Sequence, residues 1–177
     1  MIRYEDLDNQ TRKFMLNELD IDIAKGCLYV SPRLTYRGRK TYPSVLRKAI
    51  RDYDDSWLAR QLRDKKFIKI YEERKKPSGG CIKARVPCTA AEILAEGEFN
   101  RFFIRGLCAR ALEQGTNEVR VYRGKAVKNA RPQSEVLIGS VKKAKNLLND
   151  LRMKIGDEPC LGLPGGPNSG LTVRLVS

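Results

Sequence analysis

The sequence contains no histidine among its 177 residues. Histidine carries the proton transfers of most serine and cysteine hydrolases, and it is the commonest side-chain metal ligand. Its absence excludes Ser/His/Asp and Cys/His nucleophile pairs, histidine metal sites and an imidazole proton shuttle. We therefore predict a protein that is not an enzyme and that uses no cofactor and no metal ion.

Paired cysteines and long apolar runs are also missing. The chain has no Cys-x-x-Cys pair, so neither a zinc ribbon nor a redox dithiol has support. No stretch approaches the roughly 18 apolar residues of a membrane span, and the first residues lack the apolar run of a signal peptide. We expect a cytoplasmic protein with no membrane partner. The five cysteines, expected to be reduced, are Cys27, Cys81, Cys88, Cys108 and Cys160.

Acidic side chains are scarce, with 21 against 35 basic ones, which leaves a net charge of +14 and a pI near 9.8. Residues 60–154 carry 23 basic and 10 acidic side chains, a net +13 that accounts for nearly all of the excess. Such an excess attracts nucleic acid and other polyanions. The apolar fraction of 41% and the length predict a single domain over residues 1–177, mainly helical in 1–66 and mixed in 67–177.

The first 66 residues follow a helical period. Asp6 or Asp8 is suited to cap a first helix that stops near Gly26. Pro43 is suited to the first turn of a second helix, and the pair Asp55-Ser56 signals the start of a third. This pattern predicts an N-terminal helical layer.

From residue 67 onward the period changes to that of strands. Residues 67–71 form one run of strand-forming side chains, and in residues 82–86 apolar side chains alternate with basic ones. Between them lies 72–80, a charged loop rich in proline and glycine. The pattern predicts a long basic β-hairpin with a flexible tip.

Residues 90–114 carry the most regular helical stripe of the chain, and Gly115 is suited to end it. Gly97 and Gly106 lie inside this stripe, and each costs about 1 kcal/mol relative to alanine. They predict a break near Gly97 or a close helix contact, and therefore a central kinked helix. A basic stripe opposite the phenylalanines, interpreted as a solvent face, consists of Arg101, Arg105 and Arg110.

The remaining segments predict strands over 119–123 and 171–176 and a final basic helix over 141–153. The fold class is therefore α+β, with an N-terminal helical layer, a long basic β-hairpin, a central kinked helix and a small sheet closed by a C-terminal strand. Residues 162–170 are glycine-rich but lack the Gly-Lys-Ser/Thr of a phosphate-binding loop. They predict a rigid turn or, with the last strand, a docking arm that extends a neighbour's sheet.

Two groups of basic residues are the candidate nucleic-acid-binding site, because each lies on an element expected to be exposed. Lysine and arginine neutralise phosphates, and arginine also binds them bidentately. The group on the hairpin and its tip consists of Lys69, Arg74, Lys75, Lys76, Lys83 and Arg85. The group on the strand and loop that follow the central helix consists of Arg120, Arg123, Lys125, Lys128 and Arg131.

A metal-dependent nuclease is a minor alternative. Such enzymes place an acid near one strand and a Glu-x-Lys pair on the next, to hold a divalent metal that activates water. Glu73-Arg74-Lys75 has this form, with Asp54, Asp55 or Asp64 upstream. The pair falls in a predicted loop instead of an apolar strand, which argues against this reading.

Three strings of the sequence, Leu28–Leu34, Ala95–Phe102 and Gly166–Leu171, resemble segments of small uncharacterised proteins of bacterial and phage genomes. The resemblance implies a prokaryotic or phage origin. It transfers no functional residue.

Together these observations predict a non-enzymatic protein that contacts nucleic acid, DNA in preference to RNA, through phosphate-directed and largely sequence-independent contacts. The alternative is a structural or assembly protein of a phage or related particle. Its basic surface would face acidic neighbours or the packaged genome, and its partners would be a second copy or a phage or host protein. The alternative places the protein in the virion.

Overall fold

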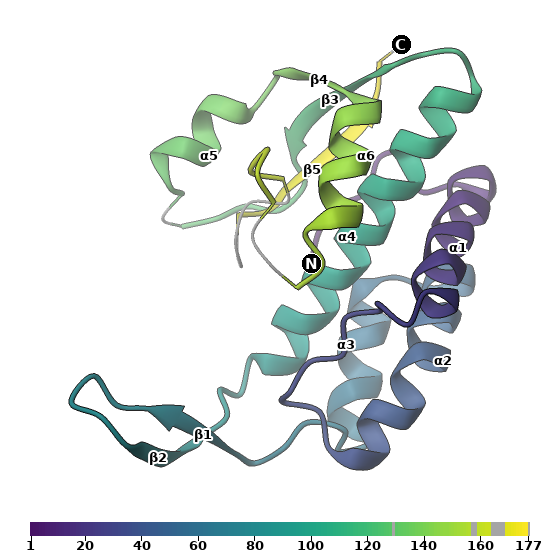
Figure 1. Cartoon of the computed structure of the whole chain (residues 1–177). Helices are drawn as coiled ribbons and strands as arrows, with labels where there is room; N and C mark the ends of the chain where they lie inside the picture. The colour runs from purple at the N-terminus through teal and green to yellow at the C-terminus, as the bar shows by residue number, and fades with distance from the viewer. Residues whose placement is uncertain (129, 157–158, 164–168, 177) are drawn as a thin grey trace.

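A computed structural model describes residues 1–128, 130–156, 159–163 and 169–176. The long helix α4 runs through the middle, with α1 to α3 on one side and the sheet, α5 and α6 on the other (Figure 1). The mixture of helices and small antiparallel sheets confirms the α+β class. The elements are α1 Asn9–Ala24, α2 Tyr36–Asp52, α3 Asp55–Asp64, β1 Tyr71–Lys75, β2 Cys81–Arg85, α4 Ala90–Glu113, β3 Glu118–Arg123, α5 Pro132–Leu137, β4 Val141–Lys143, α6 Ala144–Met153 and β5 Leu171–Leu175.

Side-chain caps fix where the first three helices begin. The Asp8 carboxylate accepts a hydrogen bond from the Thr11 amide at 2.8 Å, as the sequence predicted for α1. Asp54, and not Asp55, caps α3, because its carboxylate accepts from the Trp57 amide at 2.8 Å. Asp55 is turned inward and buried.

Helix α2 begins earlier than predicted, so Pro43 lies inside the helix and not in its first turn. The Thr35 hydroxyl accepts a hydrogen bond from the Gly38 amide at 3.0 Å and so caps the helix, which begins at Tyr36. The Thr35 amide itself donates to the carbonyl of Phe67 at 2.8 Å. This hydrogen bond to a segment distant in the sequence fixes where α2 begins, so a local sequence pattern cannot reveal the boundary.

Helix α4 is the centre of the fold and packs on α1, α3 and α6. It runs without interruption through Gly97, so the predicted break is absent. The predicted close helix contact lies at Gly106, where an added Cβ would stand 2.8 Å from the backbone nitrogen of Met15 in α1. No helix in the described part of the chain is long and apolar enough to cross a membrane.

One hydrophobic core joins the helical part to the mixed part of the chain. Leu19 of α1, Phe103 of α4, Leu147 of α6 and Val173 of β5 are fully buried in the same cluster. Phe67, which stands between α3 and the hairpin, is buried in it as well. The helical layer and the sheet therefore share their apolar interior.

Strands β4, β3 and β5 form an antiparallel sheet in which β3 is central. Val121 of β3 pairs with Val173 of β5, and residues 171–173 are fully buried. The last strand is therefore not a free arm, because it pairs with β3 of its own chain, and it forms an edge of the sheet. The proposed rigid turn falls largely on residues 164–168, outside the described residues.

The segment predicted as one helix over 141–153 consists of a short strand followed by a helix. Residues 141–143 form the edge strand β4, which pairs with residues 118–120, and helix α6 begins at Ala144. A side-chain period cannot reveal this division, because the strand is fixed by hydrogen bonds to a distant partner.

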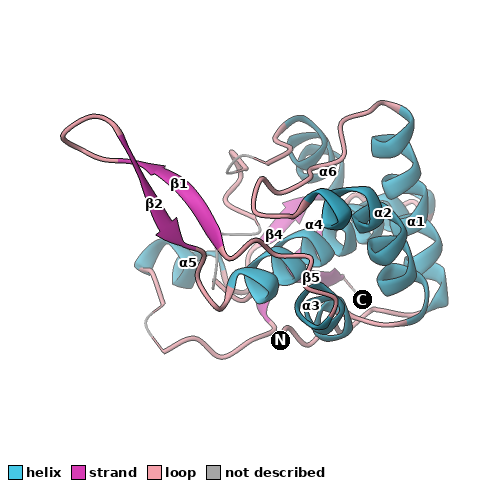
Figure 2. Ribbon diagram, turned by 90° about the horizontal axis from the view of Figure 1, so that it is seen from below, coloured by secondary structure: helices cyan, strands magenta, loops and turns pink. Residues whose placement is uncertain are grey.

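The hairpin projects from the body beside the start of α4 (Figure 2). Its first strand spans 71–75 and not 67–71, so residues 72–75 of the predicted loop belong to the ladder and only 76–80 form the turn. Phe67 and Ile68 are instead held at the body: the Phe67 carbonyl accepts from Thr35, and Ile68 bridges to Leu34. Strand residues on this arm are almost all exposed or half-exposed, so the arm has no core of its own.

Candidate nucleic-acid interface

The register of the hairpin divides its side chains between two faces. Tyr71 pairs with Arg85, Glu73 with Lys83 and Lys75 with Cys81, and directly paired side chains point to the same side. We call this side the basic face; its polar and aromatic members are Tyr71, Glu73, Lys75, Lys83 and Arg85. Lys69 precedes the strand, where its amide donates to the Arg33 carbonyl at 2.9 Å, and it lines the base of the hairpin.

The basic face carries three cations, Lys75, Lys83 and Arg85, and one carboxylate, Glu73. The Lys83 ammonium lies 4.7 Å from the centroid of the Tyr71 ring, which is itself half exposed. This cation–π contact holds both side chains on the outer surface of the arm. The face is therefore accessible and positively charged.

The opposite side of the hairpin, which we call the paired face, presents Ile70, Glu72, Arg74, Ile82 and Ala84. Glu72 accepts hydrogen bonds from Arg33 at 2.7 Å and from Arg74 at 2.8 Å. Those hydrogen bonds lower the pKa of Glu72, so it stays ionised and neutralises much of the Arg74 charge. Arg74 is therefore separated from the lysines that flank it in the sequence.

The tip of the hairpin spans residues 76–80. Gly79 and Gly80 have φ values of 89° and 78°, a conformation that residues with a side chain rarely adopt. The Lys76 amide donates to the Gly80 carbonyl at 3.0 Å and closes the turn. Lys76 is exposed there and extends the positive charge of the arm to its end.

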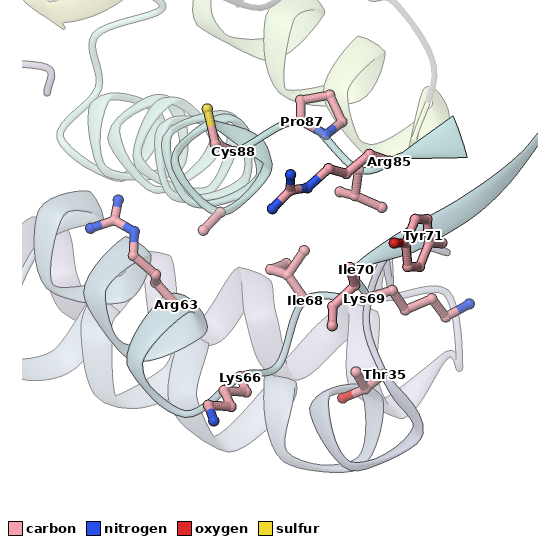
Figure 3. A pocket seen from close by; sticks show the side chains of 12 residues that line it. Thr35, Arg63, Lys66, Ile68, Lys69, Ile70, Tyr71, Arg85, Pro87 and Cys88 are labelled. Atoms are coloured by element: carbon pink, nitrogen blue, oxygen red, sulfur yellow. The ribbon is translucent and has the colours of Figure 1, made fainter. Parts of the chain in front are cut away.

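A groove of about 1190 Å³ lies at the base of the hairpin, between the end of α3 and the start of α4 (Figure 3). Its walls combine apolar side chains with cations, and none of the residues that line it in the described structure is acidic. Figure 3 shows the Arg85 guanidinium group and the Ile68 side chain directed toward the open space, with Arg63 at its edge. The lining residues are Thr35, Arg63, Lys66, Ile68, Lys69, Ile70, Tyr71, Arg85, Val86, Pro87, Cys88 and Ala91.

The second predicted group of basic residues lies on β3 and the loop after it, apart from the hairpin (Figure 1). Three of its members make contacts within the chain. Arg120 donates to the Gly139 carbonyl at 3.2 Å, Arg123 pairs with Glu135 at 2.5 Å and Lys125 pairs with Glu96 at 2.6 Å. Lys128 and Arg131 are exposed. Of the hairpin group, only Lys69 and Arg85 line the groove, whereas the other four members lie farther out on the arm. The second group lies on a different element.

The acids considered for a nuclease are not assembled into a site. Asp55 is buried and accepts a hydrogen bond from the Ile2 amide at 3.2 Å, and burial raises its pKa to about 6. Glu73 is exposed on the projecting hairpin. Within the described ranges, no group of three or more Cys, Asp and Glu side chains is placed to hold a metal ion.

The arginine stripe of α4 does not face solvent, contrary to the interpretation of the sequence. Arg105 is fully buried and Arg101 is nearly so, because α1 and α6 cover the surfaces of α4 that carry them. Arg101 donates to the Lys154 carbonyl at 2.6 Å, and Arg110 pairs with Asp8 at 2.7 Å. These arginines bind internal acceptors and are not part of the interface.

Two cations at the groove, Arg63 and Lys66, were not among the predicted site residues. Both stand near the end of α3, and they meet the hairpin only through the fold. Arg63 also forms an ion pair with Glu92 at the start of α4.

Comparisons of the chain with protein-family models, with curated proteins and with solved structures gave no match.

Proposed function

We propose that this chain is a nucleic-acid-binding protein without catalytic activity, which holds the sugar–phosphate backbone through the basic face of the hairpin. The observation that carries the proposal is the concentration of Lys75, Lys83 and Arg85 on one side of an arm that projects into solvent. Contacts to phosphate carry no sequence information, so we expect little sequence preference. DNA is the preferred ligand of this proposal.

The spacing along the arm suits a repeating polyanion. Residues two apart on a strand lie about 7 Å apart on the same face. A single strand of duplex DNA rises about 3.4 Å per nucleotide, so Lys83 and Arg85, two residues apart on β2, match the rise of about two nucleotides. The Lys75–Cys81 pair lies next to the tip and the Tyr71–Arg85 pair lies at the base, so the basic face runs along the whole arm.

The test is a triple charge reversal, Lys75→Glu with Lys83→Glu and Arg85→Glu. Binding of labelled duplex DNA would be measured by anisotropy across a range of salt concentrations. The wild-type affinity should fall steeply with salt, and the slope of log K against log salt should shrink by about 0.9 for each lost phosphate contact. The variant should lose most binding at near-physiological salt.

A matched control reverses three exposed lysines elsewhere, Lys13 and Lys25 on or beside α1 and Lys145 on α6. It changes the net charge by the same amount. If the control weakens binding as much as the hairpin variant, the attraction is that of net charge alone and the proposal fails. Unchanged binding by the hairpin variant would reject it as well.

The second candidate is a structural or assembly protein of a phage or related particle. The observation that favours it is the paired face, where Ile70 and Ile82 are 67% and 41% exposed on a two-stranded arm that has no core. Isolated two-stranded hairpins are marginally stable, and a neighbour that covers this face would stabilise the arm. Sedimentation should then reveal a concentration-dependent oligomer that Ile82→Ser weakens.

A further inference from the structure

We infer that the groove at the hairpin base accepts an unpaired base, so that the ligand is a single-stranded polynucleotide. This inference rests on the proposed function and specifies the form of nucleic acid. It combines three features of the groove: an apolar floor, an aromatic ring at the mouth and cations around it.

The floor of the groove is apolar although it is open to solvent. Ile68, Ile70, Val86, Pro87 and Ala91 all line it. Ile68 points into the space between α3 and α4, and Ile70 is 67% exposed (Figure 3). Uncovered apolar surface in a soluble domain marks a binding region. A nucleobase offers a flat apolar face of the right kind to cover it.

Tyr71 lines the groove next to this floor. Its ring is 50% exposed, and the Lys83 ammonium lies 4.7 Å from the ring centroid. No second aromatic ring in the described ranges stacks on Tyr71. Base-on-tyrosine stacking, flanked by a cation, is the usual arrangement by which proteins hold single strands without reading their sequence.

Charge decides between a nucleic acid and a second copy of this chain as the occupant. Arg63, Lys66, Lys69 and Arg85 surround the floor. Among the residues that the structure describes, the one acid paired to any of them is Glu92, which stands outside the lining. The hairpin arm and the groove are both positively charged, so the arm of a second copy would be repelled. A phosphodiester backbone complements this ring of cations while its base covers the floor.

Duplex DNA fits the groove less well than a single strand. Its bases are paired and stacked inside the helix, so their faces cannot reach Ile68 or Tyr71 unless the base is flipped out at a cost of a few kcal/mol. A single strand presents its bases freely. The groove therefore adds affinity only for single strands, whereas the cations serve both forms.

The experiment compares two labelled single strands of equal length, oligothymidylate and an abasic strand with the same phosphates and no bases. A duplex and an oligouridylate of that length complete the set, the latter to distinguish RNA from DNA. Binding would be measured by anisotropy at fixed salt. The wild-type protein should bind oligothymidylate about tenfold more tightly than the abasic strand.

The variant Tyr71→Ser should abolish this tenfold advantage and leave the affinity for the abasic strand unchanged. The matched control is Tyr53→Ser. Tyr53 directly follows the C-terminal end of α2 and is 40% exposed, close to the 50% of Tyr71, and the Lys48 ammonium approaches its ring. The control should keep the advantage. Because Tyr71 lies on the exposed arm, circular dichroism should be the same for both variants and wild type.

The outcomes separate the two proposals. If no strand and no duplex binds, the proposed function fails. If the abasic strand binds as tightly as oligothymidylate, nucleic-acid binding stands and the base-accepting groove is rejected. A dimer that Tyr71→Ser dissociates, with strand affinities unaltered, would likewise reject the groove inference and assign this surface to a second copy.

Discussion

Arg105 and Glu18 form a salt bridge of 2.8 Å at the centre of the molecule, with both side chains withdrawn from solvent. The same guanidinium group donates to Asp22 at 2.7 Å, so one arginine of α4 holds two acids one turn apart on α1. Arg152 of α6 reaches Glu18 at 2.5 Å from the other side. Three helices are thereby joined through one carboxylate.

Arg105→Met should lower the free energy of unfolding by about 3–5 kcal/mol, because it leaves Glu18 and Asp22 buried without their main partner. Urea denaturation followed by circular dichroism measures the change. The control is Arg47→Met, which breaks an exposed ion pair with Asp20 and should change stability by less than about 1 kcal/mol. Equal effects of the two substitutions would contradict the role assigned to the buried cluster.

The two glycines inside α4 should respond oppositely to alanine. Gly97→Ala should stabilise the protein by up to about 1 kcal/mol, because an added Cβ meets nothing within 4 Å and alanine favours helix. Gly106→Ala should destabilise it by about 1–3 kcal/mol, because the Cβ would stand 2.6 Å from Met15 Cγ and 2.8 Å from its backbone nitrogen. Thermal unfolding of the two variants side by side checks this, and a gain at both positions would show that α1 can move away from Gly106.

Stability should fall as the pH rises because of Glu98. Burial raises the pKa of Glu98 to about 7 against a usual value of 4.5, and this outweighs the nearby Arg101 and Arg105. The folded state therefore keeps a proton that the unfolded state releases, so the contribution of Glu98 is greatest below about pH 4.5 and is lost progressively up to about pH 7.

Glu98→Gln should flatten this dependence and make the protein about 3 kcal/mol more stable than wild type at pH 8. Urea midpoints at several pH values between 4 and 8 measure it. Asp55, whose pKa burial raises from 3.8 to about 6, supplies a loss of the same sign that is complete near pH 6 and remains in the variant. A wild-type protein whose stability rises through this window would contradict the assignment.

The hairpin should be dispensable for folding. Replacing residues 73–83 by an Asn-Gly turn joins Glu72 to Ala84, which already face each other across the strands, and it keeps the Glu72–Arg33 pair. The melting temperature should change by only a few degrees, since the removed residues lie outside the core. Duplex binding should be lost in parallel. A large fall in melting temperature would mean that the arm supports the body.

Helices α1 to α4 and α6, the hairpin and the closing strand could be predicted from the sequence, because each depends on local periodicity, caps and turn residues. Helix α5, Pro132–Leu137, was not predicted. Asp8 at the start of α1 and the buried stripe Ala144, Leu147, Leu148 and Leu151 of α6 are examples. The first strand of the hairpin was displaced by four residues, because Phe67 is held by Thr35 from another part of the chain. Pairing partners outside the local window decide such boundaries.

The candidate site was predictable only in part. The basic residues of the hairpin were evident, but their division between two faces depends on the register of Tyr71 with Arg85. Arg105 was misplaced because a helical period identifies apolar positions, and it does not tell whether a polar position will be covered by other helices. The groove joins α3, α4 and the hairpin base, so it exists only in the folded chain.

The position of α4 has a consequence for synthesis on the ribosome. Helices α1 and α3 pack on α4, which follows them in the sequence. At the usual pace of about 5–20 residues per second, the apolar stripes of the first helices remain uncovered for seconds until Phe103 and Leu107 emerge. During this interval Glu18 and Asp22 on α1 keep that surface charged and hydrated, and the arrival of Arg105 converts them into part of the interior.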